Sequence, residues 1–226
     1  MSAVVRVENV SKTYKGRGVP VEALHDTSFS VGSGEFTAIC GPSGSGKTTL
    51  LNIIGTIDSP TSGSVFIEDK DTATLSKKQL ASIRLSKLGF IFQSYNLIPV
   101  LTCQENAEFV LLLQGVTQGQ REEIVNEVLK DVGLEDKKHA FPRELSGGQQ
   151  QRVAVARAIA SRPKLILADE PTANLDSKTG KDLIDLMLEL NQKYEVTFLF
   201  STHDPMVMEA AKKIISIKDG RIVDTK

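Results

Sequence analysis

The sequence predicts an α/β fold in which a mainly parallel sheet is covered by helices, with an antiparallel β subdomain and an inserted helical lobe. Short apolar runs alternate with segments of helical periodicity along most of the chain. The chain has 226 residues, enough to bury a core without disulfides or a structural metal. We therefore expect residues 1–226 to form one domain.

In the first part of the chain, a short apolar strand signal leads into a glycine-rich loop at 41–46, and a helix is expected directly after the loop. Residues 58–63 have the composition of a turn, and the segment after them alternates apolar and polar residues as a strand does. The expected strands are 4–10, 24–31, 35–40, 64–68 and 88–92. The expected helices are 47–57 and 76–86.

The middle of the chain changes character. Residues 102–133 are mostly helical by pattern, with Val125, Val128, Leu129 and Val132 at helical spacing. A further helix is expected at 150–161. No strand signal interrupts this block, so we expect a separate helical lobe at about 94–161. The last part returns to strands at 164–168 and 196–201, a helix at 177–193, and a hairpin of 214–217 and 221–223 around Asp219-Gly220.

Composition excludes several classes of protein. With 27 Lys+Arg against 28 Asp+Glu, the net charge of −1 argues against nucleic-acid binding by bulk electrostatics. Cys40 and Cys103 are too few for a disulfide framework and are expected to be reduced thiols. Met1 to Asn9 has no apolar stretch, so no signal peptide is expected. The longest strongly apolar run, 109–113, falls far short of the roughly 20 residues that span a bilayer.

A phosphate-binding loop is the first chemical signal. The pattern G-x-x-x-x-G-K-[ST] is met by Gly41, Pro42, Ser43, Gly44, Ser45, Gly46, Lys47 and Thr48, and Thr49 follows as a further expected nucleotide contact. Glycines let backbone N–H groups converge on phosphate oxygens, and the following helix adds positive potential. Lys47 would reach the β- and γ-phosphates, and Thr48 would bind Mg²⁺. The alternative is a flexible glycine-serine turn.

Two carboxylates end the apolar run Leu165-Ile-Leu-Ala, where ligands bind in open α/β sheets. Asp169 would hold Mg²⁺, and Glu170 would polarise the attacking water as a general base. Alone, a solvated Asp-Glu-Pro turn is an equal alternative. Together the loop and the carboxylates indicate a P-loop NTPase core that binds a nucleoside triphosphate with magnesium. The absence of an Asn-Lys-x-Asp sequence weighs against GTPases.

The segment Leu145-Ser146-Gly147-Gly148-Gln149 narrows the family, because it is the signature sequence of the ATP-binding cassette (ABC) ATPases, which the chain resembles. Other positions match in order. The resemblance implies that Tyr14 stacks on adenine and that Gln93 touches Mg²⁺ and the lytic water. It further implies that Asp176, in Asn174-Leu175-Asp176, lies in a loop at the dimer interface, and that His203 is the switch histidine at the γ-phosphate.

The resemblance implies a head-to-tail homodimer in the ATP-bound state, with each ATP between Gly41–Thr48 of one subunit and Ser146–Gln149 of the other. The chain is most similar to ATPases of the lipoprotein-releasing and macrolide-exporter group in the segments 57–63, 88–99, 149–152 and 171–176. Ala173 and Cys103 depart from the residues usual in that group. The similarity implies a cytoplasmic protein, held at the inner face of the plasma membrane by a permease of a separate chain. Four alternatives remain: a cell-division or wall-remodelling regulator, a generic cassette of another branch, a nucleic-acid-stimulated ATPase, and a non-hydrolysing scaffold.

The permease contact is expected near residues 94–105. The apolar side chains of Leu97, Ile98, Val100 and Leu101 would receive a short cytoplasmic helix of the permease. Packing of these side chains inside the helical lobe is an equal alternative.

Overall fold

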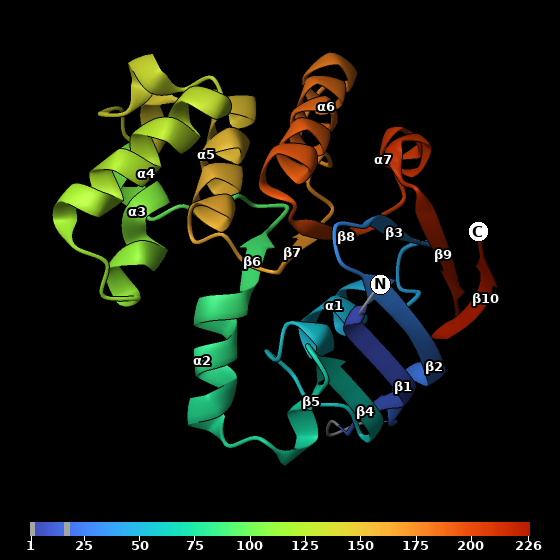
Figure 1. The fold of residues 1–226 in the computed structure, drawn as a ribbon. Coiled ribbons are helices and arrows are strands. Elements are labelled where there is room, and N and C mark those ends of the chain that lie inside the picture. Colours follow the sequence, from blue (N-terminus) through green and yellow to red (C-terminus); the bar gives the residue numbers. More distant parts are fainter. Residues whose placement is uncertain (1–2, 16–18) are drawn as a thin grey trace.

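The computed structural model describes residues 3–15 and 19–226, and its main sheet is mainly parallel (Figure 1). Five neighbouring strands run parallel, and the last strand joins the edge antiparallel to its neighbour. The order is β10 (Arg221–Thr225), β9 (Lys213–Lys218), β3 (Phe36–Cys40), β8 (Thr197–Thr202), β7 (Leu165–Asp169) and β6 (Leu88–Ile91). The predicted α/β class is confirmed.

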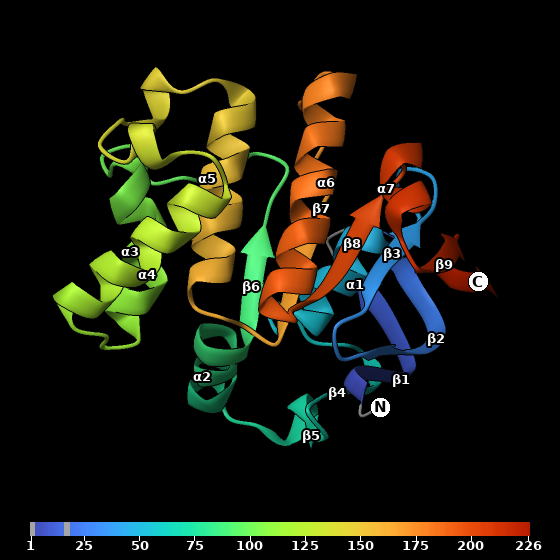
Figure 2. The same ribbon diagram turned by 45° about the horizontal axis from the view of Figure 1, so that its top comes forward.

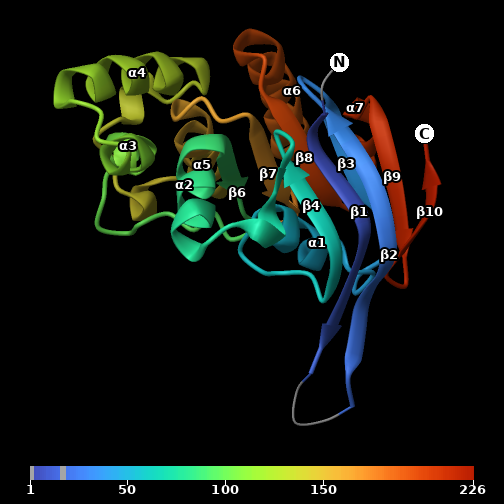
Figure 3. The ribbon, with the colours of Figure 1, turned by 60° about the horizontal axis from the view of Figure 1, so that its bottom comes forward.

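A second, antiparallel sheet contains the N-terminal strands, as predicted. Its order is β2 (Val21–Gly32), β1 (Ala3–Tyr14), β4 (Ser62–Ile67) and β5 (Lys70–Asp71). Figure 3 shows β1 and β2 beside β4, at the opposite end of the molecule from α3 (Cys103–Leu113) and α4 (Gln118–Asp131). Pairing across β1 and β2 runs from Ala3 with Gly32 to Tyr14 with Val21, so both strands are longer than the sequence predicted.

Seven α-helices connect the strands in the described part of the chain, and several begin directly after capping residues. Ser76, Thr102 and Ser146 each close a capping box, which fixes the starts of three helices. The helices are α1 (Lys47–Ile54), α2 (Lys77–Lys87), α3 (Cys103–Leu113), α4 (Gln118–Asp131), α5 (Gly147–Ala160), α6 (Ser177–Tyr194) and α7 (Pro205–Ala210). Short 3₁₀ turns lie at Thr72–Thr74, Glu135–Lys137 and Pro142–Glu144.

The main sheet is buried on both faces, which explains its continuous apolar runs. On one face Phe36, Phe198 and Phe200 pack with α5, α6 and α7, and the rings of Phe36 and Phe200 lie 4.5 Å apart between centroids. On the other face Leu199 packs with α1 and the antiparallel sheet. Figure 2 shows α5 and α6 over the first of these faces. The alternation of Phe198, Leu199 and Phe200 is the period-two pattern of a strand.

Three details differ from the sequence predictions. Helix α1 ends at Ile54, because Gly55 and left-handed Thr56 (φ 54°) turn the chain away. Helix α5 begins at Gly147 rather than Gln150, because the Ser146 cap precedes it. Helix α7 was not expected; Asp204 caps it and Pro205 begins it.

The predicted lobe boundaries at 94 and 161 stay a prediction, although α3, α4 and α5 occupy that span and pack on one another (Figure 1). Met1 and Ser2, which the signal-peptide expectation includes, lie outside the described residues. Among the residues that are described, every helix is too short or too polar to span a bilayer.

Candidate active site

The ends of three adjacent strands bring the predicted chemistry together. Strands β3, β7 and β8 run parallel, with Cys40 paired with Thr202 and Asp169 with Ser201. The carboxyl ends of these strands therefore lie at one edge of the sheet, where ligands of open α/β sheets bind. The loop 41–46 follows β3, Glu170 follows β7, and His203 follows β8.

The loop 41–46 has a backbone path that only glycine adopts without strain. Gly44 and Gly46 have φ of 77° and 100°. A Cβ on Gly46 would lie 2.5 Å from Ala23 O, and one on Gly41 would lie 2.1 Å from Ile217 O. Helix α1 starts at Lys47 without a side-chain cap, so its first N–H groups are left for another acceptor. The loop and helix end form an anion site of the phosphate-binding type.

Lys47 is buried and lies over the loop. Its Nζ donates hydrogen bonds to Gly41 O (2.8 Å) and Pro42 O (3.1 Å), and lies 3.7 Å from Glu170 Oε1. Ser45 Oγ is buried and has no hydrogen-bond partner among residues 3–15 and 19–226. A buried hydroxyl without a partner costs free energy, so an anion whose oxygens accept from it fits this cradle.

Thr48 and Asp169 meet at the other side of the loop. Thr48 Oγ1 donates to Asp169 Oδ1 at 3.1 Å, and Ser201 Oγ donates to the same oxygen at 2.6 Å. A hydroxyl and a carboxylate side by side are hard oxygen donors. Mg²⁺ is bound through one or two such groups together with water and phosphate oxygens, so these residues fit a magnesium ion.

Glu170 is held in a strained conformation next to His203. Its φ of 46° is left-handed, and its N–H donates to Ser201 O at 2.9 Å. The Glu170 side chain is 15% exposed, and Oε1 lies 2.9 Å from Nδ1 of His203, whose own side chain is 70% exposed. Left-handed backbone at a residue other than glycine persists only where the surrounding structure holds it, and such strain gathers at functional sites.

A cavity of about 470 Å³ joins these groups. From the predicted set, it is lined by Ser43, Gly44, Gly46, Lys47, Thr48, Thr49, Gln93, Glu170 and His203. Four further lining residues, Val21, Glu22, Ala23 and Ala173, had no sequence signal as site residues. Strand β2 supplies the first three by passing over Gly46, a contact that only the fold reveals.

The thiol of Cys40 lies directly before the loop. Burial raises the pKa of Cys40 to about 11; the charge of Lys47 opposes this rise and that of Glu170 adds to it. The thiol is therefore neutral at pH 7, so Cys40 does not repel an anion bound in the loop 41–46.

Tyr14 lies outside the cavity lining in the side-chain arrangement seen. It is 42% exposed, and its hydroxyl donates to Asp58 Oδ2 at 2.9 Å. Lys12 Nζ lies 4.8 Å from the centre of the Tyr14 ring and donates to Asp58 Oδ1 at 2.7 Å. Tyr14 pairs with Val21, which does line the cavity. Its predicted contact with adenine stays a prediction.

The segment 146–149 forms the N-terminus of α5 and does not line the cavity of its own chain. Ser146 Oγ accepts from Gln149 N (3.3 Å), and Gln149 Oε1 accepts from Ser146 N (2.9 Å). A Cβ on Gly147 would lie 2.8 Å from the Tyr95 hydroxyl, and one on Gly148 would lie 2.5 Å from Thr179 Cγ2. A larger side chain at either position would therefore have to displace Tyr95 or Thr179.

Asp176 caps α6 close to that segment. It accepts from the hydroxyl and N–H of Thr179 and from the N–H of Lys178, and these bonds lower the pKa of its carboxyl. An ionised cap suits a helix N-terminus. Its predicted place at a dimer interface stays a prediction.

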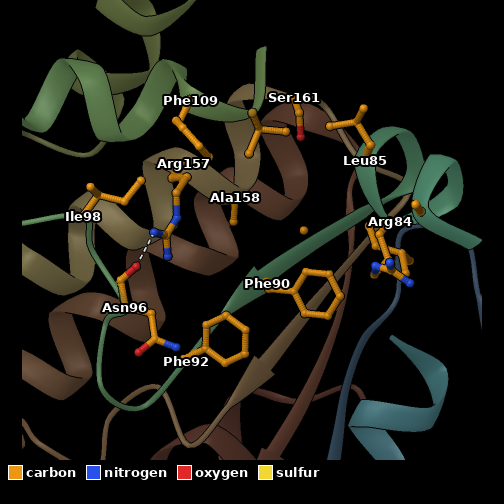
Figure 4. A pocket seen from close by; sticks show the side chains of 14 residues that line it. Arg84, Leu85, Phe90, Phe92, Asn96, Ile98, Phe109, Arg157, Ala158 and Ser161 are labelled. Carbon is orange, nitrogen blue, oxygen red and sulfur yellow. Dashed lines mark hydrogen bonds between the residues drawn. The ribbon is translucent and has the colours of Figure 1, made fainter. Parts of the chain in front are cut away.

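A second hollow, of about 490 Å³, lies between α2, β6, α3 and α5, and we call it the lobe groove (Figure 4). Its lining includes Arg84, Leu85, Phe90, Phe92, Asn96, Ile98, Phe109, Val110 and Arg157. The four apolar residues expected at the permease contact lie in different environments. Ile98 lines the groove, Leu97 packs on the core, Val100 is 77% exposed and Leu101 is half-buried.

The chain is similar to known proteins along nearly its whole length. The family model described as ABC transporter matches residues 24–173. The dimeric structure of a post-hydrolysis state of the ATP-binding cassette MJ0796 of Methanocaldococcus jannaschii, bound to ADP and Pi, superposes with a TM-score of 0.90 at 44% identity, covering 98% of this chain and 97% of that one.

Two curated relatives have more specific names. The lipoprotein-releasing system ATP-binding protein LolD of Anaeromyxobacter dehalogenans is 43% identical over 220 residues, which is 97% of this chain and 92% of that protein. The macrolide export ATP-binding/permease protein MacB of Brucella melitensis is 42% identical over 220 residues, which is 97% of this chain and 34% of that protein.

Proposed function

The chain belongs to the ABC transporter family as an ATP-binding, ATP-hydrolysing subunit, and from this premise we propose that it drives a membrane permease with a large extracytoplasmic domain. The permease is of the lipoprotein-release or macrolide-export type. One observation carries the hydrolytic part: Lys47, Glu170 and His203 meet at a single cavity beside the glycine loop. The alternative role, control of a division or wall-remodelling complex, would use the same hydrolysis.

In this proposal the residues of the cavity have different roles in binding and hydrolysing ATP. The N–H groups of the loop and Lys47 bind the β- and γ-phosphates of ATP, and Ser45 Oγ has a free donor for them. Mg²⁺, held through Thr48, Asp169 and Gln93, would neutralise phosphate charge. Glu170 accepts a proton from the water that attacks the γ-phosphate, and His203 fixes the carboxylate and contacts the terminal phosphate.

A second copy of the chain completes the site in this proposal. The segment Ser146–Gln149 is absent from the cavity lining of its own chain, yet it presents a helix N-terminus and two glycines of the kind that approach phosphate closely. The MJ0796 cassette, at 44% identity, is dimeric with ADP and Pi. We therefore place Ser146–Gln149 of one subunit over the ATP of the other, with Asp176 at the interface between them.

The lobe groove is the docking site for the permease. Its floor is apolar, with Phe90, Phe92 and Phe109, and Arg157 lies at its side (Figure 4). A short amphipathic cytoplasmic helix of the permease fits a groove of this kind. MacB, whose name joins an ATP-binding part to a permease part, supports a membrane partner for a cassette of this sequence. Docking holds the chain at the inner face of the plasma membrane.

Two measurements on the full chain test the proposal. Phosphate release from MgATP should be measurable with the purified protein and lost in Lys47→Ala. Purification from membranes in a mild detergent should recover a permease with four spans and a large outer domain. No phosphate release with that partner present would contradict the hydrolytic role. Recovery of a permease of another architecture would contradict the subgroup, and stimulation of hydrolysis by DNA or RNA would favour the nucleic-acid alternative.

A further inference from the structure

Gln151 is a fully buried glutamine on α5, with 0% of the residue exposed. Its Nε2 donates a hydrogen bond of 2.9 Å to Pro171 O and lies 3.5 Å from Phe92 O. Pro171 follows Glu170 in the chain, and Phe92 precedes Gln93. One side-chain amide therefore contacts the backbone next to both residues that the proposed function assigns to the attacking water.

The other end of this amide has no partner. Gln151 Oε1 is buried and makes no hydrogen bond within the described protein. An unpaired buried carbonyl costs free energy that an apolar side chain of similar length, such as methionine, would avoid. Packing alone therefore does not account for glutamine here. The hydrogen bonds of this side chain are made by its Nε2 group alone, to Pro171 O and Phe92 O, within the described residues.

The backbone around Gln93 depends on side chains for its bonds. Asn174 Nδ2 donates to Gln93 O at 2.9 Å, and Arg157 of α5 donates to Tyr95 O at 3.0 Å. Tyr95 and Asn96 have φ of 60° and 50°, so this connection leaves β6 by a left-handed path. Glu170 is left-handed as well. The chain is therefore left-handed just after Gln93 and at Glu170. Gln151 contacts the backbone of both segments, at Phe92 and at Pro171.

Helix α5 connects this contact to the other subunit. Gln151 lies about one helical turn after Gly147, at the start of the helix that presents Ser146–Gln149. A helix transmits a small rigid-body shift over one turn with little loss. Figure 1 shows α5 alongside β6, the strand that leads to Gln93.

We propose that Gln151 is a positioning residue for ATP hydrolysis, one that sets Glu170 and Gln93 relative to the Ser146–Gln149 segment so that ATP bound by the second subunit brings both into place. It acts through its bonds to Pro171 and Phe92 and touches no substrate. The inference rests on the proposed function, because it takes Glu170 and Gln93 as the residues that handle the water.

The first test is Gln151→Met, which keeps the length of the side chain and removes the donor. We expect kcat for phosphate release to fall at least tenfold, while KM for ATP stays within twofold. Direct equilibrium binding of ATP should keep full stoichiometry, which separates misplacement of Glu170 from a loss of folded protein. Gln114→Met is the matched control, because Gln114 Nε2 donates to Leu85 O at 2.8 Å between two helices away from the cavity; its kcat should stay within twofold of wild type.

Two further measurements decide the matter if Gln151→Met does not fold. Gln151→Asn keeps the amide but shortens its reach by one methylene, and it should also lower kcat with little change in KM. Added to Glu170→Gln, either change should cause a much smaller loss than it causes alone, because only the contact beside Gln93 still depends on the amide.

Wild-type kcat in a folded Gln151→Met or Gln151→Asn, or full additivity with Glu170→Gln, would overturn the inference. Absence of hydrolysis by the wild-type protein with its partner would instead refute the proposed function.

Discussion

Nδ1 of His203 lies 2.9 Å from Oε1 of Glu170, and the same oxygen lies 3.7 Å from Nζ of Lys47. An ionised carboxylate only accepts hydrogen bonds, so the imidazole carries the hydrogen of this contact. The ring thereby fixes one carboxylate oxygen at the cavity. Oδ1 of Asp169 is fixed separately by Thr48 and Ser201, so two successive carboxylates have different partners and can take different roles.

Glu170→Gln should uncouple binding from hydrolysis. The amide keeps the shape and a contact to His203 but accepts no proton, so we expect kcat to fall by about 10²-fold or more. ATP binding should remain, and the variant should form a stable dimer with MgATP. Phosphate release and size-exclusion chromatography check both parts. A monomer at saturating MgATP would speak against the shared site, and wild-type turnover would speak against Glu170 as the base.

Tyr14 offers a test that separates its ring from its hydroxyl. Tyr14→Phe removes the bond to Asp58 and keeps the aromatic face, so ATP affinity should be unchanged. Tyr14→Ala removes both and should weaken ATP binding about fivefold to tenfold, the loss expected for one aromatic stacking contact. Titration with ATP measures the two constants. Equal weakening in both variants would show that the hydroxyl, rather than stacking, is what matters.

Asp58 should make the fold sensitive to acid. Burial alone would raise the pKa of its carboxyl, but hydrogen bonds from Lys12, the Ser59 N–H and Tyr14 outweigh it and hold the pKa below its usual value. A lowered pKa adds stability above the ordinary Asp value near 4, and this is lost as pH falls through the folded-state pKa.

Asp58→Asn should therefore lower the free energy of unfolding by about 1 kcal/mol at pH 7, and the difference from wild type should shrink below about pH 4. Urea unfolding at pH 7 and pH 3 measures this. Asp136→Asn is the control, because the Asp136 side chain is 74% exposed and pairs only with the adjacent Lys137. A deficit for Asp58→Asn that persists at pH 3 would contradict the ionic origin of the effect.

Local patterns were enough to predict most elements and the centre of the candidate site. The loop 41–46 and the carboxylates of Asp169 and Glu170 sit at strand ends, and strand ends can be recognised in sequence. Val21, Glu22 and Ala23 line the same cavity only because β2 pairs with β1 and passes over Gly46. That contact depends on the register between β1 and β2, and no residue pattern in the sequence predicts it.

Gln151 shows a second limit of sequence reasoning. Gln149, Gln150 and Gln151 are identical in type, and the phase of α5 gives each a different partner. Gln149 closes the capping box, Gln150 donates to Leu145 O, and Gln151 turns into the core. The helix that the sequence predicts at 150–161 has Gln151 in its first turn, where no pattern indicates burial. In the structure α5 begins at Gly147, and its packing on the core places the Gln151 side chain against Pro171 and Phe92.

The lobe groove should be the permease contact, and Ile98→Glu tests it. Ile98 lines the groove, so a carboxylate there would be desolvated by a docked apolar helix, and recovery of the permease in detergent should fall at least tenfold. Basal ATP hydrolysis by the isolated chain should stay within twofold, since Ile98 does not line the cavity beside the glycine loop.

Val100→Glu is the matched control, because Val100 is close in the chain, 77% exposed and outside the groove lining. It should recover the permease as wild type does. If instead Val100→Glu loses the permease while Ile98→Glu keeps it, the partner binds the outer surface of the 94–105 segment and the groove has another use. Loss in both variants with normal hydrolysis would mean that the contact covers the segment and the groove together.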